Sequence, residues 1–477
     1  MLRLVILTIL SLYRIVNSVH AYRTNLENKN TIWITIDKNT AWKLVQGEII
    51  ISPSGRGLKK EEPGNYTIIE IDESDISNIS QYIHTQHRRC GGFVAHVSHE
   101  EAKEHMKKYA NAIQNRFSFS YVINNGKETN NLIKIINCNR LQDTVDSLVQ
   151  NFQTRWYKTD DGVQASIFIQ ESWKGITSSR SDITVDTFSH MPKFKQASII
   201  VTIQGSQITN DIVIIGAHLD STSNQTKIPT KAPGADDDAS GIAVLTEVLY
   251  VIVNAGYKPR KTIKIMAFAA EEAGIQGSKA IAKDYRSRGQ SVLGMLNFDM
   301  VGYKCKKKDI FIYNDDGTSE GQNNFLENLV KIYLPEASVG FSRCSEPCSD
   351  HHSWIVESFP ASYVSSSAVD APPPFYHNVK DLEVDKENMN KFAKLAVSYM
   401  SELAKSASIS FNKLEITTGT TNRNHYNGKQ MLRSFTKRNK YSVLLSFLSV
   451  MILTLLYSRS FLFKINYTVS LVTSFSM

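Results

Sequence analysis

The chain has 477 residues, of which 42% are hydrophobic, 10% aromatic and 21% charged, and this composition excludes a mainly disordered or collagen-like protein. Its 54 Lys and Arg residues only slightly exceed its 46 Asp and Glu residues, giving a formal net charge of +8 that argues against a nucleic-acid-binding protein. The five cysteines are too few for a disulfide scaffold and lack zinc-finger spacing.

Residues 1–21 are typical of a secretory signal peptide. Arg3 supplies the positive start, residues 4–12 are apolar, and residues 19–21 approximate a small-x-small cleavage site. The alternative is a buried N-terminal helix. Secretion permits disulfides and predicts glycosylation at three Asn-X-Ser/Thr sites, Asn65, Asn78 and Asn224.

Residues 22–140 are predicted to form a small α+β domain. Short apolar stretches at residues 66–71 and 92–96 indicate strands, and the polar helical pattern around residues 100–114 indicates a helix. This part of the chain shows no catalytic spacing that we recognise.

Residues 141–407 have a different pattern, in which strongly apolar runs alternate with helical segments such as residues 242–255. Four runs rich in Ile and Val predict buried strands, at residues 198–204, 211–217, 262–269 and 292–298. This alternation predicts an α/β domain with a mostly parallel central sheet flanked by helices.

The C-terminal part starts with residues 408–440, which are rich in Thr, Asn, Ser and Lys and predict a polar linker or stalk. Residues 441–457 form an uncharged apolar run, slightly shorter than the roughly 20 residues that span a bilayer, and are a candidate transmembrane helix. Residues 458–477 form a short tail. The sequence therefore predicts a protein of the secretory pathway that is either secreted or anchored at the cell surface by this helix.

Metal-binding residue types follow three of the predicted strands and precede one predicted helix. In chain order they are His218, Asp220, residues 236–238, Glu271, Glu272 and Asp299. Each group alone has a simpler explanation as a loop residue or a helix cap. Because ligands bind beyond the carboxyl ends of the strands in such sheets, the combination predicts a metal centre there.

Imidazole and carboxylate ligands suit zinc or a similar divalent ion. Two histidines and three or more carboxylates suffice for two ions, with one carboxylate bridging them. Paired ions can polarise a carbonyl group and generate a hydroxide nucleophile, and a general base must then accept the proton of the water. Glu271, next to the expected ligand Glu272, is placed for that role.

Six segments carry this pattern in order along residues 141–407. They are Gly216–Thr222 (GAHLDST), Ala232–Gly241 (APGADDDASG), Ala269–Gly274 (AAEEAG), Asn297–Met300 (NFDM), Cys344–His351 (CSEPCSDH) and Tyr376–His377. Together they resemble the secreted bacterial leucyl aminopeptidases of the co-catalytic dizinc metallopeptidase family. The resemblance implies a zinc exopeptidase fold and hydrolysis of the N-terminal bond of peptides with a free N-terminus through a metal-bound hydroxide.

The resemblance also implies that five residues of this sequence bind two zinc ions. His218, Asp237 and Asp299 would hold one ion, with Asp237 as the bridge. Asp237, Glu272 and His377 would hold the other ion.

Further roles follow from the same resemblance. Glu271 would be the general base, and Asp220 would orient the first ligand histidine from behind. Cys344 and Cys348 would form a short disulfide at the wall of the substrate pocket. The N-terminal domain, through the segment at residues 89–94, resembles the propeptide of some of these enzymes, although a permanent accessory domain is the alternative.

The sequence departs from the family at the substrate pocket. Glu346 lies between the paired cysteines, where an aromatic residue would be expected. We hypothesise that the preference for leucine is weakened and that Glu346 admits a polar or basic side chain. The remaining lining residues would be Met300, Tyr313, Phe341 and Tyr363.

Three other functions use the same residues differently. A glutaminyl cyclase or a carboxypeptidase on a related fold would keep a zinc site and change the reaction. A non-catalytic ectodomain would bind a partner only, but such a protein normally loses metal ligands, and all five expected ligands are present here.

Overall fold

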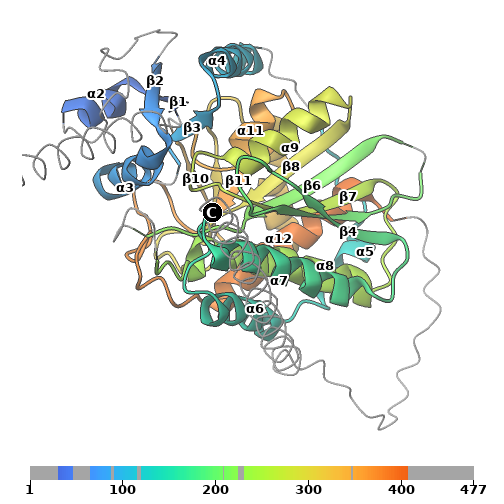
Figure 1. The fold of residues 1–477 in the computed structure, drawn as a ribbon. Coiled ribbons are helices and arrows are strands. Elements are labelled where there is room, and N and C mark those ends of the chain that lie inside the picture. The colour runs from blue at the N-terminus through green and yellow to red at the C-terminus, as the bar shows by residue number, and fades with distance from the viewer. Residues whose placement is uncertain are drawn as a thin grey trace, which may run out of the picture. The chain divides into compact units, whose positions relative to one another are not determined.

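The computed structural model describes residues 31–46, 65–87, 91–114, 120–207, 209–223, 230–344 and 347–406. Its main sheet has eight strands in the order β10-β9-β11-β8-β6-β7-β5-β4. Figure 1 shows the sheet with helices packed around it. The strands are β4 (Ile183–Phe188), β5 (Ser198–Ile203), β6 (Asp211–His218), β7 (Thr262–Phe268), β8 (Ser291–Phe298), β9 (Ile310–Tyr313), β10 (Val339–Ser342) and β11 (Ala361–Ser365).

The centre of this sheet is parallel. Strand β6 pairs in parallel with β7 and β8, and β8 pairs in parallel with β11. Antiparallel pairs lie to either side, between β5 and its neighbours β7 and β4, and between β9 and β11. The predicted fold class, an α/β domain with a mostly parallel central sheet, is confirmed, and all four predicted strands are present.

Helices cover both faces of the sheet, which explains the continuous apolar runs of the central strands. Val213 and Ile215 of β6 belong to a core cluster shared with the helices of one face, and Ile212 and Ile214 to a cluster shared with those of the other. The first face carries α6 (Cys138–Asn151), α7 (Asp160–Thr177), α8 (Ser240–Asn254), α10 (Glu320–Tyr333) and α12 (Lys386–Ala404), and the second carries α9 (Gln276–Ser287) and α11 (His351–Val356).

A separate three-stranded antiparallel sheet precedes this domain. Its order is β2-β1-β3, and with helices α2 to α4 it forms what we call the N-terminal unit. The elements are β1 (Thr31–Asp37), α2 (Lys38–Gln46), β2 (Tyr66–Asp72), a 3₁₀ turn (Glu73–Asp75), α3 (Ile76–His87), β3 (Phe93–His96) and α4 (His99–Gln114).

Helix α5 (Gly126–Ile133) follows the N-terminal unit in the chain, but it packs in the main core. Leu132 of α5 and Leu141 of α6 both belong to the largest hydrophobic cluster, together with residues of α8 and α12. The predicted boundary at residue 140 lies inside α6, so these contacts favour a boundary before residue 126.

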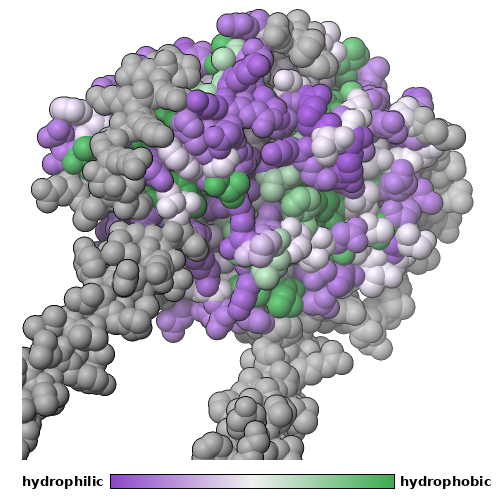
Figure 2. Space-filling model, turned by 45° about the horizontal axis from the view of Figure 1, so that its top comes forward, coloured by the Kyte–Doolittle hydropathy of each residue, from purple (hydrophilic) through white to green (hydrophobic). Residues whose placement is uncertain are grey.

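The surface in Figure 2 is mostly hydrophilic, with hydrophobic side chains in a few small groups. Within the described ranges, no helix is both long and apolar enough to cross a membrane. The predicted signal peptide, linker, transmembrane helix and tail lie outside the described residues, as does Asn224, and remain predictions. Asn65 is exposed and Asn78 is partly exposed on α3, so both are accessible to a glycan.

Candidate metal centre

The candidate ligands meet where the central parallel strands end. His218 is the last residue of β6, Asp299 directly follows β8, and Glu272 lies four residues after β7. Since these three strands are neighbours, their carboxyl ends bring the side chains together. Asp237 comes from the turn that precedes α8, and His377 from the loop before α12.

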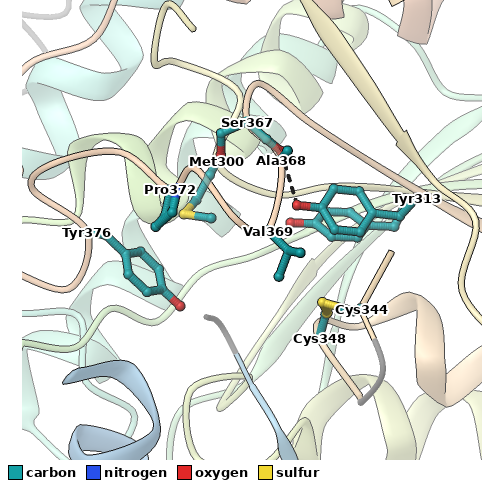
Figure 3. A pocket seen from close by; sticks show the side chains of 10 residues that line it. Met300, Tyr313, Cys344, Cys348, Ser367, Ala368, Val369, Pro372 and Tyr376 are labelled. Atoms are coloured by element: carbon teal, nitrogen blue, oxygen red, sulfur yellow. Dashed lines mark hydrogen bonds between the residues drawn. A yellow bond between two sulfur atoms is a disulfide. The ribbon is translucent and has the colours of Figure 1, made fainter. Parts of the chain in front are cut away.

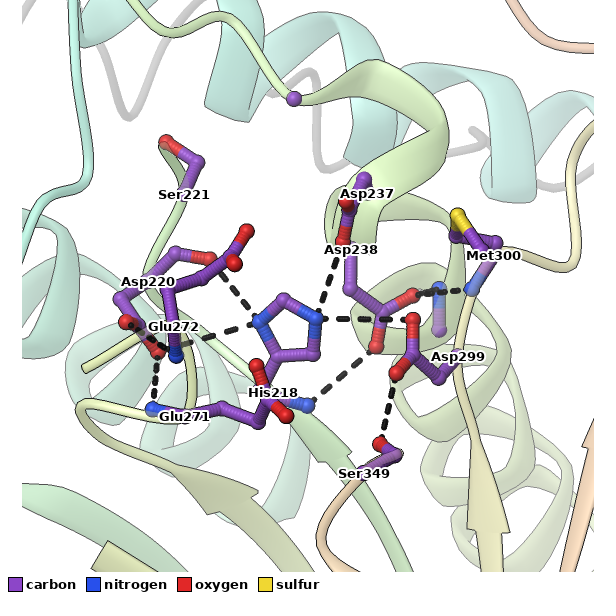
Figure 4. A network of polar contacts seen from close by, with 12 residues as sticks. His218, Asp220, Ser221, Asp237, Asp238, Glu271, Glu272, Asp299, Met300 and Ser349 are labelled. Carbon is purple, nitrogen blue, oxygen red and sulfur yellow. Dashed lines mark hydrogen bonds and ion pairs between the residues drawn. The ribbon is translucent and has the colours of Figure 1, made fainter. Parts of the chain in front are cut away.

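Asp237 lies between the two histidines and offers one carboxylate oxygen to each. Its Oδ1 is 3.0 Å from Nε2 of His218, and its Oδ2 is 2.7 Å from Nε2 of His377. Asp299 Oδ1 is 3.5 Å from the same nitrogen of His218, and Glu272 Oε1 is 3.1 Å from Nε2 of His377. The structure therefore brings all five predicted ligands together, in the two sets that the resemblance implies (Figure 4 shows the set around His218).

The chemistry of these atoms fits metal ions. Nδ1 of His218 lies 3.0 Å from the backbone carbonyl oxygen of Asp220, which can only accept, so this nitrogen carries the proton. Its Nε2 then faces carboxylate oxygens, and such a group of acceptors is satisfied by a cation between them or by a second proton on the ring. Burial alone would lower the pKa of His218, but Asp299, Asp220 and Asp237 raise it well above its usual value.

The second histidine behaves in the same way. Burial lowers the pKa of His377, and the carboxylates of Glu272 and Asp237 outweigh it and raise the value to about 10. Burial raises the pKa of Glu272 to about 7 despite His377. Both shifts reflect buried carboxylates that need positive charge, which divalent ions would supply.

Asp238 is another acidic residue close to His218 and Asp299, and its carboxylate is near enough to complete an alternative ligand group. Its oxygens, however, already accept hydrogen bonds from backbone N–H groups of His218 (3.2 Å), Gly241 (2.8 Å) and Met300 (3.3 Å). Asp238 therefore holds the backbone around the site, which leaves Asp237 as the candidate for a ligand shared by both sets.

Asp220 contacts His218 through its backbone, whereas a contact through its carboxylate was expected. Its backbone carbonyl, not its carboxylate, holds the ring of His218, since its Oδ1 is 3.8 Å from Nδ1. The carboxylate instead accepts the backbone N–H groups of Glu271 (2.9 Å) and Glu272 (3.2 Å). One residue thus positions the first histidine, the expected base and the neighbouring ligand.

Two further residues, which sequence reasoning missed, hold the loop that carries Asp237. The carboxylate of Asp381 accepts the backbone N–H groups of Asp236 (2.9 Å) and Asp237 (3.1 Å). The fully buried guanidinium of Arg155 donates to the carbonyl oxygens of Leu219, Pro233 and Gly234, which lie on the two loops around the site. Neither residue stands in a recognisable motif, so only the folded chain reveals them.

Glu271 is fully buried, and neither of its carboxylate oxygens accepts a hydrogen bond from the described residues. Burial raises its pKa well above the usual value, and Glu272 and Asp350 add to this effect against the opposing influence of His218. The raised pKa means that this carboxylate has a high affinity for a proton, which a general base needs.

Backbone strain is concentrated beside these groups. Ala270, Met300 and His377 have positive φ values of 56°, 52° and 46°, in the left-handed region that non-glycine residues rarely adopt. Ala270 immediately precedes Glu271, Met300 immediately follows Asp299, and His377 is itself an expected ligand. Such conformations cost about 1–3 kcal/mol each and cluster at functional sites.

A pocket that is partly open to solvent lies beside the metal centre, since Met300 and Tyr376, which line it, are next to Asp299 and His377 in the chain (Figure 3 shows its lining). Met300, Tyr313 and Tyr363 line it as predicted, and the predicted disulfide between Cys344 and Cys348 is present at its wall. Its other lining residues are Ser367, Ala368, Val369, Pro372 and Tyr376.

Phe341 is not among the residues that line this pocket, and its side chain, on the edge strand β10, is 49% exposed. Its place in the substrate pocket remains a prediction. Glu346 lies outside the described residues, so its role remains a prediction.

The chain is similar to known peptidases in both sequence and fold. Residues 198–400 match the family model described as peptidase family M28. Leucine aminopeptidase 1 of Arthroderma otae is 33% identical over 299 residues, covering 59% of this chain and 78% of that protein, and that of Trichophyton rubrum is 32% identical with the same coverage. The crystal structure of the LapA aminopeptidase of Legionella pneumophila has a TM-score of 0.68 at 24% identity, covering 80% of this chain and 100% of that chain, which shows a shared fold.

Proposed function

This chain belongs to peptidase family M28, and on that premise we propose that it is a zinc-dependent aminopeptidase that uses two metal ions to release the first residue of peptides with a free N-terminus. The observation that carries the proposal is Asp237, which presents one oxygen toward His218 and the other toward His377. A carboxylate between two separate sets of ligands is the arrangement that a two-ion site needs.

Charge balance also supports two ions. The carboxylates around the site are buried, and the guanidinium of Arg155 is buried among them as a permanent cation. Buried charges must be paired, and two divalent ions would balance carboxylates that one ion leaves uncompensated. The buried carboxylates are Asp220, Asp236, Asp237, Asp238, Glu271, Glu272, Asp299, Asp350 and Asp381.

In the proposed reaction, bound zinc would polarise the peptide carbonyl and lower the pKa of water. Glu271 accepts the proton of the attacking water and delivers it to the leaving amine. Its backbone N–H is held by Asp220, which also holds that of Glu272, so the base keeps its position relative to the ligand. The buried surroundings keep bulk water from competing for these groups.

The cavity favours substrates with an apolar or aromatic first side chain. The rings of Tyr313 and Tyr363 pack 4.3 Å apart, and the hydroxyl group of Tyr313 is bonded to the backbone carbonyl of Ser367. With this hydroxyl engaged, the two rings present mainly carbon surface. The hypothesis that Glu346 admits a basic side chain is tested by comparing substrates whose first residue is basic with substrates whose first residue is apolar.

The test of the function uses the purified full chain, before and after limited proteolysis that removes the N-terminal unit. We expect about two zinc ions per chain, hydrolysis of leucyl and phenylalanyl anilides, and no hydrolysis of their N-acetylated forms. An arginyl anilide reports on Glu346.

Other outcomes would contradict the proposal. Release of C-terminal residues would favour a carboxypeptidase, and cyclisation of N-terminal glutamine would favour a glutaminyl cyclase. A folded, processed chain without metal and without hydrolysis would favour a protein that only binds its partner.

We further propose that the N-terminal unit keeps the enzyme latent. The backbone N–H of Gly92 donates to the carbonyl of Pro347 in the disulfide loop (2.7 Å), and that of Ala95 donates to Gly274, which lies two residues after Glu272 (3.2 Å). A Cβ at Gly91 would lie 2.4 Å from the Pro347 oxygen. These contacts place the unit against two loops that frame the site.

Cleavage between α4 and α5 is therefore expected to raise kcat/KM without changing the metal content. If the docked unit leaves the site open in a tenth of the molecules or fewer, the gain is about tenfold or more. Steady-state kinetics before and after cleavage, with separation of the fragments verified by size-exclusion chromatography, check this. Equal kcat/KM after complete removal of the unit would identify a permanent accessory domain.

A further inference from the structure

Three buried histidines meet where the N-terminal unit contacts the catalytic domain. His96 ends β3 and His105 lies on α4, whereas His352 lies on α11 of the catalytic domain. Their exposed fractions are 1%, 6% and 3%. The ring centroids of His96 and His105 are 4.9 Å apart, and those of His105 and His352 are 5.3 Å apart.

The hydrogen bonds limit how many protons these rings can carry while the two parts are docked. Nε2 of His105 is 3.2 Å from Nε2 of His352, so one nitrogen donates and the other must keep its lone pair. Nδ1 of His96 lies 3.3 Å from the ammonium group of Lys279, which can only donate, and its Nε2 is 2.9 Å from the hydroxyl of Thr35. A second proton on His96, or protons on both members of the pair, would break these bonds.

The charged groups around the rings do not favour protonation. Lys279, on α9, forms an ion pair with Glu101 of α4, and Lys108 of α4 forms one with Glu357, just beyond α11. Lys193 adds positive charge near His96, Glu104 is engaged by Lys108, and the neighbouring His351 faces Asp315. Within the described ranges, none of these carboxylates forms an ion pair or a hydrogen bond with the three rings.

Burial, followed by these cations and the neighbouring rings, lowers the pKa of His96 and of His105 well below the usual value. Burial and His351 lower that of His352 to about 3. Burial also lowers the pKa of Lys279 to about 8, although Glu101 opposes this shift.

We propose that His96, His105 and His352 form an acid-sensitive latch, which holds the N-terminal unit on the catalytic domain at neutral pH and releases it in mild acid. Separation of the two parts exposes the three rings to water, where a histidine takes its proton near pH 6.5. Because the docked rings have lower pKa values than the exposed ones, docking is fully stabilised above about pH 6.5 and weakens as the pH falls below it.

The number of protons makes the inference quantitative. If opening is linked to the uptake of three protons, the opening constant rises by up to about 1,000-fold for each pH unit below pH 6. Burial opposes the shift, but Lys279 and the backbone N–H of Val97 lower the pKa of Glu101, so this carboxylate adds no proton to the slope above about pH 5.

Hydrogen exchange of the full chain between pH 6.5 and 5, corrected for intrinsic exchange rates, measures the opening of α4 and α11. We expect a slope that approaches three protons in the unmodified chain, two in His96→Gln, and one in the double variant His105→Leu and His352→Leu. His99→Gln, which replaces a histidine that packs on Trp33 inside the N-terminal unit, is the matched control and keeps the slope of three.

A slope near zero in the unmodified chain, or a slope of three that persists in the double variant, would overturn the latch. Each slope is read from folded protein, and His96→Gln gives a second reading if the double variant does not fold. The measurement uses no substrate, so its outcome is independent of the proposed peptidase activity and of latency.

Discussion

Replacement of Glu271 by Gln is expected to lower kcat by about 10²–10⁴-fold, the range that general acid–base catalysis contributes. The amide has nearly the same shape as the carboxylate but cannot accept the proton of the attacking water. Glu271 is in neither of the two candidate ligand groups around His218, so the metal content is expected to stay at the level of the unmodified chain. Steady-state kinetics and elemental analysis on the same preparation test both parts.

Glu272→Gln is the matched control, because the two residues are adjacent, buried and of the same type. Glu272 lies 3.1 Å from His377, and its loss is expected to lower the metal content as well as kcat. A Glu271→Gln variant that retains most of its kcat would show that another group accepts the proton. A variant that loses metal would place Glu271 among the ligands.

Replacement of Asp237 by Asn is expected to remove most of both metal ions and to abolish hydrolysis. Asp237 is the residue with contacts to both histidines, so its neutral amide weakens both ion sites at once. Elemental analysis after dialysis against a weak chelator measures the loss, and circular dichroism verifies that the chain is folded.

Asp238→Asn distinguishes the two adjacent acidic residues. Since the oxygens of Asp238 accept backbone N–H groups, this variant is expected to keep its metal ions and to have a lower melting temperature. The reverse result, metal loss in Asp238→Asn and not in Asp237→Asn, would assign the bridge to Asp238.

The sequence predicted those parts of the molecule that depend on local patterns. The strands β5 to β8 are mostly buried, short runs rich in β-branched and other apolar residues, so their length and composition identify them. The ligand positions lie directly at the ends of these strands and in a motif that the resemblance supplied. Both kinds of information are contained in short stretches of the chain.

Features that depend on distant contacts could not be predicted in this way. Asp381 holds the backbone of Asp236 from a position 145 residues away, and its own surroundings in the sequence show no pattern. The exposure of Phe341 depends on its place on the edge strand, which its residue type alone did not predict. The polar pattern of α5 did not reveal that this helix packs against α12.

If the proposed ions bind, the concentration of carboxylates at the site would tie the lifetime of the protein to the supply of zinc. Each ion present at a thousand times its dissociation constant would stabilise the folded chain by about 4 kcal/mol, and two such ions would contribute as much as the whole stability of many domains. Chains made under zinc starvation would then be expected to unfold more often and to be removed sooner by proteases. Metal supply would then regulate how much of this protein survives, in addition to how active each copy is.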